Sequence, residues 1–392
     1  MSRAQKIVVL LALLGALAIY AANPHREERV SAAPEIPKTW DEAALEEWVT
    51  PVAGLNMRPT HISAKEYYSL PVENLRTYPV YFPGREPEGY WDMVRSAGPQ
   101  PLIEPEKLKT EADWIEAGRK VFEEAATPQL STVDQKLIAQ ARSREFMEKQ
   151  GATPFPDGTL DGLRWSPTKQ GVALTILSCG GCHVLHRSDG ARVPGAPRLA
   201  EVSRTRQYKF RSVLASYLES PNRVLTGAPP FFMGGARGIW LYQAYGVPWL
   251  KDDPNQRLKD FTDADYEEFV LAQRRAGAIT RWNGSLLYPA KIPDLIGIKD
   301  RKHLDHTGTH LHRGVGDLMR YAAQVGFAEM ADFGPYHMLS PDTKRVQARL
   351  PDEALYALAL YIYSLKPPPN PNPFDEKAKA GEKLFTREGC AA

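Results

Sequence analysis

A five-residue motif, C-x-x-C-H, constrains this chain more than any other feature of its sequence. It stands in the stretch SCGGCHVLH, where Cys179 and Cys182 are separated by two glycines and His183 follows at once. Two thiols one helical turn apart reach the two vinyl groups on one edge of a porphyrin, and the adjacent imidazole projects towards the iron. The motif therefore predicts haem c attached through both cysteines, with His183 as the proximal ligand of the haem iron.

Three other kinds of site use a Cys-x-x-Cys pair. Structural zinc needs about four ligands, and a second such pair is missing here. A thioredoxin-like redox pair lies in a βαβ pattern; residues 171–178 suit a strand, but no alternation of strands and helices surrounds them. A simple disulfide forms outside the cytoplasm. The histidine directly after the second cysteine favours haem. The histidines that could complete a zinc site are His303, His306, His310 and His312.

The charge balance argues against one class of partner. The 392 residues include 49 Lys and Arg against 47 Asp and Glu, a net charge of +2, with no long basic run. Nucleic-acid binding therefore has no electrostatic footprint in this chain. Hydrophobic residues at 43% and charged residues at 24% are ordinary for globular domains. The 33 prolines predict long, irregular connections between elements.

The N-terminus has the pattern of an export segment. Arg3 and Lys6 precede residues 7–22, which carry no charge, and small residues follow at the end of this stretch. The order of basic, apolar and small residues is typical of a signal peptide. As a helix the apolar stretch would span about 24 Å, less than the ~30 Å hydrocarbon core of a bilayer. We expect residues 1–22 to be a signal peptide or an N-terminal membrane anchor, and the protein to be periplasmic or exported.

A short sequence pattern occurs twice, once near each end of the haem region. The pattern A-G-x-K-(V/L)-F occurs in residues 116–124 and again in residues 379–390. Both copies resemble the N-terminal helix of c-type cytochromes, in which a small residue permits a close helix crossing and an aromatic residue packs beside the haem. Cys390 follows the second copy, and residues 390–392 match the first positions of another C-x-x-C-H. We expect a second haem motif here, cut before its second cysteine and its histidine.

The segment between the two copies ends in a helix pattern. Pro351 and Asp352 suit a helix start, and apolar residues then recur with helical spacing up to Leu365. A run of prolines in residues 367–373 follows; it cannot continue a helix and favours a stiff, extended spacer. This resembles the closing helix of a cytochrome c domain followed by an interdomain connector.

These features predict a mainly α protein: a cytochrome c-like haem domain with long irregular insertions, plus the start of a second cytochrome c-like domain. The N-terminal extension is rich in proline and aromatic residues, carries no catalytic motif, and is expected to wrap the haem domain. The expected segments are the signal or anchor at 1–22, the extension at 23–110, the first haem domain at 111–366, the linker at 367–375 and the truncated second domain at 376–392.

With these motifs the chain resembles the dihaem c-type cytochromes of the bacterial cytochrome c peroxidase kind. The resemblance covers residues 111–392 and includes residues 292–324, where Pro293, Leu295, Gly308 and Leu318 resemble the family's P-x-L, D-G and L-E pattern. The large insertion and the histidine-rich segment suggest a divergent branch similar to dihaem rubber oxygenases. The resemblance implies two haems, of which one meets peroxide or dioxygen while the other relays electrons, and a redox protein as electron donor or acceptor.

The ligand on the second face of the iron stays open among several candidates. The family usually supplies a distal histidine between the C-x-x-C-H motif and the P-x-L segment, but here the only histidine there is His186, too close to His183 to reach the opposite face easily. Met338 lies on the stretch before the closing helix, where single-haem cytochromes place a methionine ligand. His310 in the histidine-rich segment, Met233, and an open position are the alternatives.

Two hypotheses for function follow. In the first, the protein is a dihaem peroxidase- or oxygenase-like oxidoreductase that reduces peroxide or activates dioxygen at one haem. In the second, it is a non-catalytic electron carrier or sensor whose irons are six-coordinate. The two-domain layout favours the first, and the missing distal histidine together with Met338 favours the second. No catalytic residue can be assigned from the sequence.

Overall fold

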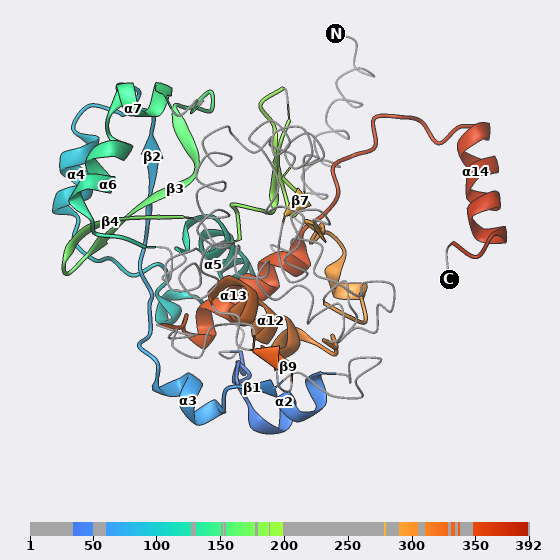
Figure 1. Ribbon diagram of the computed structural model, residues 1–392. Helices are drawn as coiled ribbons and strands as arrows, with labels where there is room; N and C mark the ends of the chain where they lie inside the picture. The colour runs from blue at the N-terminus through green and yellow to red at the C-terminus, as the bar shows by residue number, and fades with distance from the viewer. Residues whose placement is uncertain are drawn as a thin grey trace, which may run out of the picture.

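The computed structural model of the protein (Figure 1) describes residues 34–49, 60–126, 131–149, 152, 154–176, 179–187, 189–198, 278–279, 290–304, 310–327, 331–333, 336–337 and 348–390. The expected export segment lies outside these ranges, as do three of the candidate ligands, Met233, His306 and Met338. None of the helices within these ranges is both long and apolar enough to cross a membrane.

Helix is the more abundant element, but strands are numerous enough that the described part of the chain is mixed rather than clearly mainly α. The expectation of a mainly α protein is met only in part, because the extension and the insertion build antiparallel strands. The helices are α2 (Glu42–Trp48), α3 (Ala64–Ser69), α4 (Tyr90–Ser96), η1 (Pro105–Lys107), α5 (Glu111–Glu124), α6 (Gln135–Ala141), α7 (Arg144–Lys149), η6 (Ile298–Asp300), α12 (Val315–Phe327), α13 (Asp352–Ser364) and α14 (Glu376–Arg387).

The described strands form small sheets in which every pair is antiparallel. Their orders are β1-β9-β10, β2-β3-β4, β5-β6 and β7-β8. The strands are β1 (Thr60–His61), β2 (Tyr78–Tyr81), β3 (Thr159–Thr168), β4 (Gly171–Ile176), β5 (Val184–His186), β6 (Arg192–Pro194), β7 (Ala278–Ile279), β8 (Ala290–Lys291), β9 (Ala331–Phe333) and β10 (Tyr336–His337).

Helices α5 and α13 pack directly on each other at the centre of the molecule (Figure 1). On α5, the small and apolar residues of the repeated pattern, Ala117, Gly118, Val121 and Phe122, are all buried. A Cβ atom at Gly118 would lie only 1.9 Å from the carbonyl oxygen of Ala357 on α13. The backbones therefore approach more closely than any residue larger than glycine permits.

Helix α13 begins and ends where its sequence pattern predicts. Pro351 is the N-cap residue and Asp352 the first helical residue, and Leu365 caps the other end before the prolines. The apolar stripe is confirmed, since Leu355 and Leu358 are fully buried. Helix α13 packs against both α5 and α12.

The first part of the N-terminal extension packs onto this core. Trp40, Trp48 and Tyr67, from the α2–α3 region, are at most 1% exposed and belong to the same hydrophobic cluster as α5, α12 and α13. Each buried side chain of this size stabilises the fold by roughly 2 kcal/mol. Polar contacts add to this, because the Trp48 indole N–H donates to the Leu311 carbonyl oxygen at 3.1 Å.

Residues 78–96 of the N-terminal extension and residues 135–176, which lie between α5 and the C-x-x-C-H motif, form a separate lobe (Figure 1). Strand β2 pairs with β3, which pairs with β4, and helices α4, α6 and α7 lie beside this sheet. The lobe has its own small core of Val80, Phe82, Val94, Ile138 and Trp165 with their neighbours. The lobe therefore combines residues from both sides of the boundary expected at residue 110.

Helix α14 stands apart from the rest of the molecule (Figure 1). It follows the exposed linker of residues 366–375, and none of its residues is buried. Leu384 and Phe385 of the repeated pattern are about half exposed, at 49% and 56%. The same sequence pattern is thus buried in α5 and exposed in α14.

Candidate functional site

The C-x-x-C-H motif forms one hydrogen-bonded turn. The backbone N–H groups of Cys182 and His183 both donate to the Cys179 carbonyl oxygen, at 3.1 and 3.0 Å. Both cysteines are half-buried. The two thiols and the imidazole therefore belong to residues of a single hydrogen-bonded backbone turn.

Helix α5 anchors this turn to the core. The Gly180 N–H donates to the Phe122 carbonyl oxygen near the end of α5, at 3.0 Å. Cys179 also packs against the hydrophobic cluster to which Phe122 belongs. Because α5 is held by α13 through Gly118, the position of the motif is set by the central helix crossing.

The imidazole of His183 has a defined tautomer. Its Nδ1 atom lies 3.1 Å from the carbonyl oxygen of Pro293. A carbonyl oxygen only accepts hydrogen bonds, so Nδ1 carries the proton. Nε2 is then the nitrogen whose lone pair suits a metal, as in metal sites where the second ring nitrogen donates to a carbonyl. Pro293 is the proline of the P-x-L segment. Its contact with His183 joins two segments that are far apart in the sequence.

A glycine turn connects His183 with the Pro293 segment. The Gly195 N–H donates to the His183 carbonyl oxygen, and the Gly195 carbonyl accepts from the Leu295 N–H, both at 2.7 Å. Gly195 has a positive φ of 85°, and a Cβ atom there would lie 2.8 Å from Leu365 Cδ1. The positive φ therefore favours glycine here, and a methyl group would also displace the end of the Leu365 side chain.

Arg198 was not singled out from the sequence, but it holds the motif from the other side. Its backbone N–H donates to the Cys182 carbonyl oxygen at 2.9 Å. Its Nη1 donates to the Gly181 carbonyl oxygen at 3.1 Å. The guanidinium places a positive charge beside the turn and satisfies the Gly181 carbonyl, while the backbone N–H satisfies that of Cys182. An arginine following G-x-P is a weak sequence signal, so only the fold reveals this role.

The three histidines of the histidine-rich segment that the structure describes, His303, His310 and His312, have different surroundings. His310 is 2% exposed, and its ring lies edge-on to Trp48 at 4.7 Å between centroids. The Nδ1 of His312 donates to the Arg301 carbonyl oxygen, and its Nε2 accepts from Tyr363. His303 is exposed. Over the ranges that the structure describes, there is no group of three or more His, Cys, Asp or Glu side chains that could hold a metal ion.

His186 faces a different neighbour. Its ring stacks on Phe155, with centroids 4.1 Å apart and planes 13° from parallel. Burial lowers the pKa of His186, and the nearby Arg192 lowers it further. The ring is therefore engaged in a stacking contact on the strand that follows the motif.

Cys390 lies in the turn after α14. Its N–H donates to the Phe385 carbonyl oxygen at 3.0 Å, and its thiol is exposed. Gly389, directly before it, has a φ of 75°. Cys390 thus follows a helix with no buried residue, whereas His310 packs against Trp48 of the main hydrophobic cluster.

The chain matches no family model, no curated protein and no solved structure. The surroundings of Cys179 and Cys182 differ from a thioredoxin-like site, because β4 before the motif pairs antiparallel with β3 and strand β5 follows His183 directly. Two thiols on one turn with an adjacent, oriented imidazole fit the donor set of a covalently attached haem, which needs no larger ligand cluster.

Proposed function

We propose that this chain holds haem c covalently at Cys179 and Cys182 and transfers electrons through it. The observation that carries the proposal is the contact between His183 Nδ1 and the Pro293 carbonyl oxygen, which lies 110 residues away in sequence. Metal-ligating histidines almost always give their second ring N–H to a carbonyl or carboxylate. A fold that only paired the two cysteines would not require such a partner for the imidazole.

Each residue of the motif has one role in attachment. The thiols of Cys179 and Cys182 would hold the haem through two thioether bonds, each formed by addition of S–H across a vinyl group. This addition consumes no oxidant or reductant. His183 Nε2 would bind the haem iron, while the Pro293 carbonyl oxygen accepts the hydrogen bond from Nδ1–H. Haem c then supplies a one-electron couple at iron, whose potential depends on the axial ligands and their hydrogen bonds.

The fold around the motif supports a fixed redox centre. The central crossing of α5 and α13 holds the turn through Phe122. Arg198 and Gly195 donate hydrogen bonds to the carbonyl oxygens of the last three residues of the motif, Gly181, Cys182 and His183. A rigid site suits electron transfer because little structure has to reorganise when the charge changes. We propose an exported protein that exchanges electrons with a redox partner protein, with membrane anchoring through residues 7–22 as one form of that placement.

The test is covalent haem retention in variants of the full chain, expressed in a host that matures c-type cytochromes. The C179A/C182A double variant is expected to lose covalent haem in a pyridine haemochrome assay, whereas the matched C390A variant is expected to keep it. Mass spectrometry should find the added tetrapyrrole on the wild-type peptide that contains Cys179 and Cys182. Haem retained by the double variant, or an unmodified wild-type peptide, would contradict the proposal.

A dihaem oxidoreductase is the second candidate, and α14 favours it. This helix repeats the α5 pattern, has its apolar side chains exposed and ends next to Cys390, so it has the properties of the first helix of a second haem unit. Visible spectra with and without carbon monoxide separate the two candidates. A high-spin spectrum that changes with carbon monoxide supports peroxide or dioxygen chemistry; a low-spin spectrum that does not change supports an electron carrier or sensor.

A further inference from the structure

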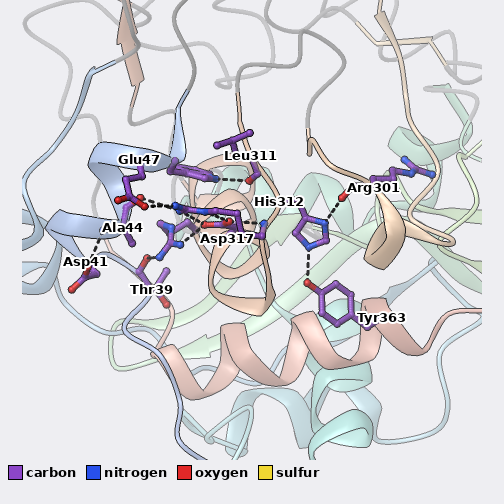
Figure 2. Close-up of polar contacts among 12 residues, drawn as sticks. Thr39, Asp41, Ala44, Glu47, Arg301, Leu311, His312, Asp317 and Tyr363 are labelled. Atoms are coloured by element: carbon purple, nitrogen blue, oxygen red, sulfur yellow. Dashed lines mark hydrogen bonds and ion pairs between the residues drawn. The ribbon is translucent and has the colours of Figure 1, made fainter. Parts of the chain in front are cut away.

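We infer that Tyr363 and His312 are positioning residues for the axial imidazole, acting through Arg301 on the segment that contains Pro293. This inference rests on the proposed haem site and assigns a means of tuning it. The contacts begin at Tyr363 on α13, pass through His312, and end at the Pro293 carbonyl oxygen that accepts from His183. Figure 2 shows the part of this path formed by Tyr363, His312 and Arg301.

The first step joins α13 to the segment after Pro293. His312 Nδ1 lies 2.8 Å from the Arg301 carbonyl oxygen, and His312 Nε2 lies 2.6 Å from the Tyr363 hydroxyl. The carbonyl can only accept, so Nδ1 donates; a neutral ring then accepts the Tyr363 O–H proton at Nε2. Burial, and to a lesser extent Asp317, raises the pKa of Tyr363 to about 12, which keeps this donor protonated at neutral pH.

The second step is made by the Arg301 side chain. Its Nη1 donates to the Asp294 carbonyl oxygen at 3.0 Å, and its Nη2 donates to the Asp294 carboxylate at 2.7 Å and to the Ile296 carbonyl at 3.2 Å. A planar guanidinium that binds three oxygens fixes the backbone of this turn in one orientation. His312 therefore holds the main chain of Arg301 while the side chain of Arg301 holds Asp294 and Ile296.

The third step reaches the site. Pro293 is joined to Asp294 by one peptide unit, and this peptide carries the carbonyl oxygen that accepts from His183 Nδ1. Leu295 is tied to the Gly195 turn, so the segment is held from both sides. Because the peptide is planar, rotation of the Asp294 backbone turns the Pro293 carbonyl away from the imidazole.

The consequence is electronic. A strong hydrogen bond from Nδ1–H makes the imidazole a better electron donor to a metal. That stabilises the oxidised form of the iron and lowers the reduction potential, since hydrogen bonding around an axial ligand is one of the controls on haem potential. Loss of the Tyr363 hydroxyl should weaken the hydrogen bond from His183 to Pro293 and so raise the reduction potential of the haem.

The decisive experiment compares Y363F with the matched variant Y356F on the same helix, where the ring packs edge-on to Trp114. Spectroelectrochemical titration of the haem-loaded full chain should show that Y363F shifts the ratio of reduced to oxidised haem about tenfold towards the reduced form. For a one-electron couple this is a rise of about 59 mV. Y356F should match wild type, and R301K should shift in the same direction as Y363F.

A second readout separates this inference from the haem proposal. If no variant and no wild-type protein carries haem, the proposed function fails, and nitrogen-15 NMR of the full chain still reports the His183 ring tautomer. Wild type should show the Nδ1–H form, and Y363F a mixture of both forms. An unchanged potential in haem-loaded Y363F, or an unchanged tautomer in the haem-free protein, overturns the role of Tyr363.

Discussion

At the scale of single residues, two glycines in the same position of the repeated pattern have opposite surroundings. Gly118 on α5 has the Ala357 carbonyl oxygen where its Cβ would be, whereas Gly381 on α14 has nothing within 4 Å of that position. The sequence around both glycines is nearly the same. The difference in their surroundings therefore comes from helix packing and not from the local sequence.

Substitution by alanine should destabilise the protein at Gly118 but not at Gly381. G118A should lower the free energy of unfolding by about 2 kcal/mol or more, because α13 must move to make room for the methyl group. G381A should leave that quantity unchanged and raise the helicity of α14, since alanine favours helix by about 1 kcal/mol over glycine. Urea denaturation followed by circular dichroism measures the first effect, and an equally stable G118A protein would contradict the close crossing.

A buried carboxylate ties α12 to the N-terminal extension. Asp317 is 2% exposed and accepts from Arg313, through its Nε at 2.9 Å, and from Arg320 (Figure 2). Arg313 also forms an ion pair with Glu47 on α2, at 2.9 Å. Burial acts to raise the pKa of Asp317, but the hydrogen bonds from Arg313 and Arg320 outweigh it and hold this pKa below its ordinary value.

The sign of the pH dependence follows from this lowered pKa. Asp317 stabilises the fold above the unfolded-state pKa of about 3.9, and this contribution is lost as the pH falls through the lower folded-state value. D317N should cost about 3–5 kcal/mol at pH 7, because it leaves a buried arginine charge without its partner. The cost should shrink in acid.

Urea denaturation at pH 7 and near pH 3 measures both values. The control is E47Q, which alters an exposed member of the same network and should cost less than about 1 kcal/mol at pH 7. A D317N protein whose loss of stability is the same at both pH values would show that ionisation of this carboxylate has no part in holding the extension.

At the scale of elements, the β2–β3–β4 lobe shows how two distant segments fold as one unit. Trp165 on β3 is 3% exposed and lies opposite Tyr78 of the extension. Its ring is edge-on to Trp91 on α4, and the Arg142 guanidinium lies over the Trp91 ring, 4.1 Å from its centroid. The lobe core is separate from the cluster that contains Cys179.

W165A should therefore damage the lobe and spare the motif. We expect a loss of about 3–5 kcal/mol in the free energy of unfolding, as for other large-to-small core changes. V133A, at a position that is 45% exposed, should change stability by less than about 0.5 kcal/mol. Chemical denaturation gives both values. If W165A abolished covalent haem in the soluble protein, the independence of the two cores would be wrong.

At the scale of the whole molecule, the body and α14 differ in how they are held. The body contains the α5–α13 crossing and one large hydrophobic cluster, whereas α14 has twelve residues and none of them is buried. Its N-cap, Asp375, accepts from the Ala378 N–H at 2.9 Å, which is a local contact. A helix of this length without tertiary contacts is marginal in water.

Hydrogen exchange followed by mass spectrometry should reveal this difference. Amides of α14 in the 392-residue chain should exchange at close to unprotected rates, while amides of α13 should be protected up to global unfolding. Slow exchange in α14 would mean that another surface covers Leu384 and Phe385. The α5 amides serve as the internal control, because they carry the same sequence pattern in a buried setting.

The sequence by itself determined the features that depend on neighbouring residues. The C-x-x-C-H spacing gives one turn with a histidine at its end, and the start of α13 at Asp352 and its end before the prolines follow from capping and helical periodicity. These features could be predicted because the interactions that set them lie within a few residues of one another. Haem binding and electron transfer stay predictions drawn from the same motif.

Only the tertiary structure decided which distant groups meet. The contact of His183 with Pro293, the pairing of β2 with β3, and the place of His310 among aromatic rings join segments that no local pattern connects. The same A-G-x-K-x-F pattern is buried in α5 and exposed in α14 because only α5 has a partner helix that fits. Such pairings depend on shape complementarity and on the entropy of closing long loops, which residue spacing along the chain does not encode.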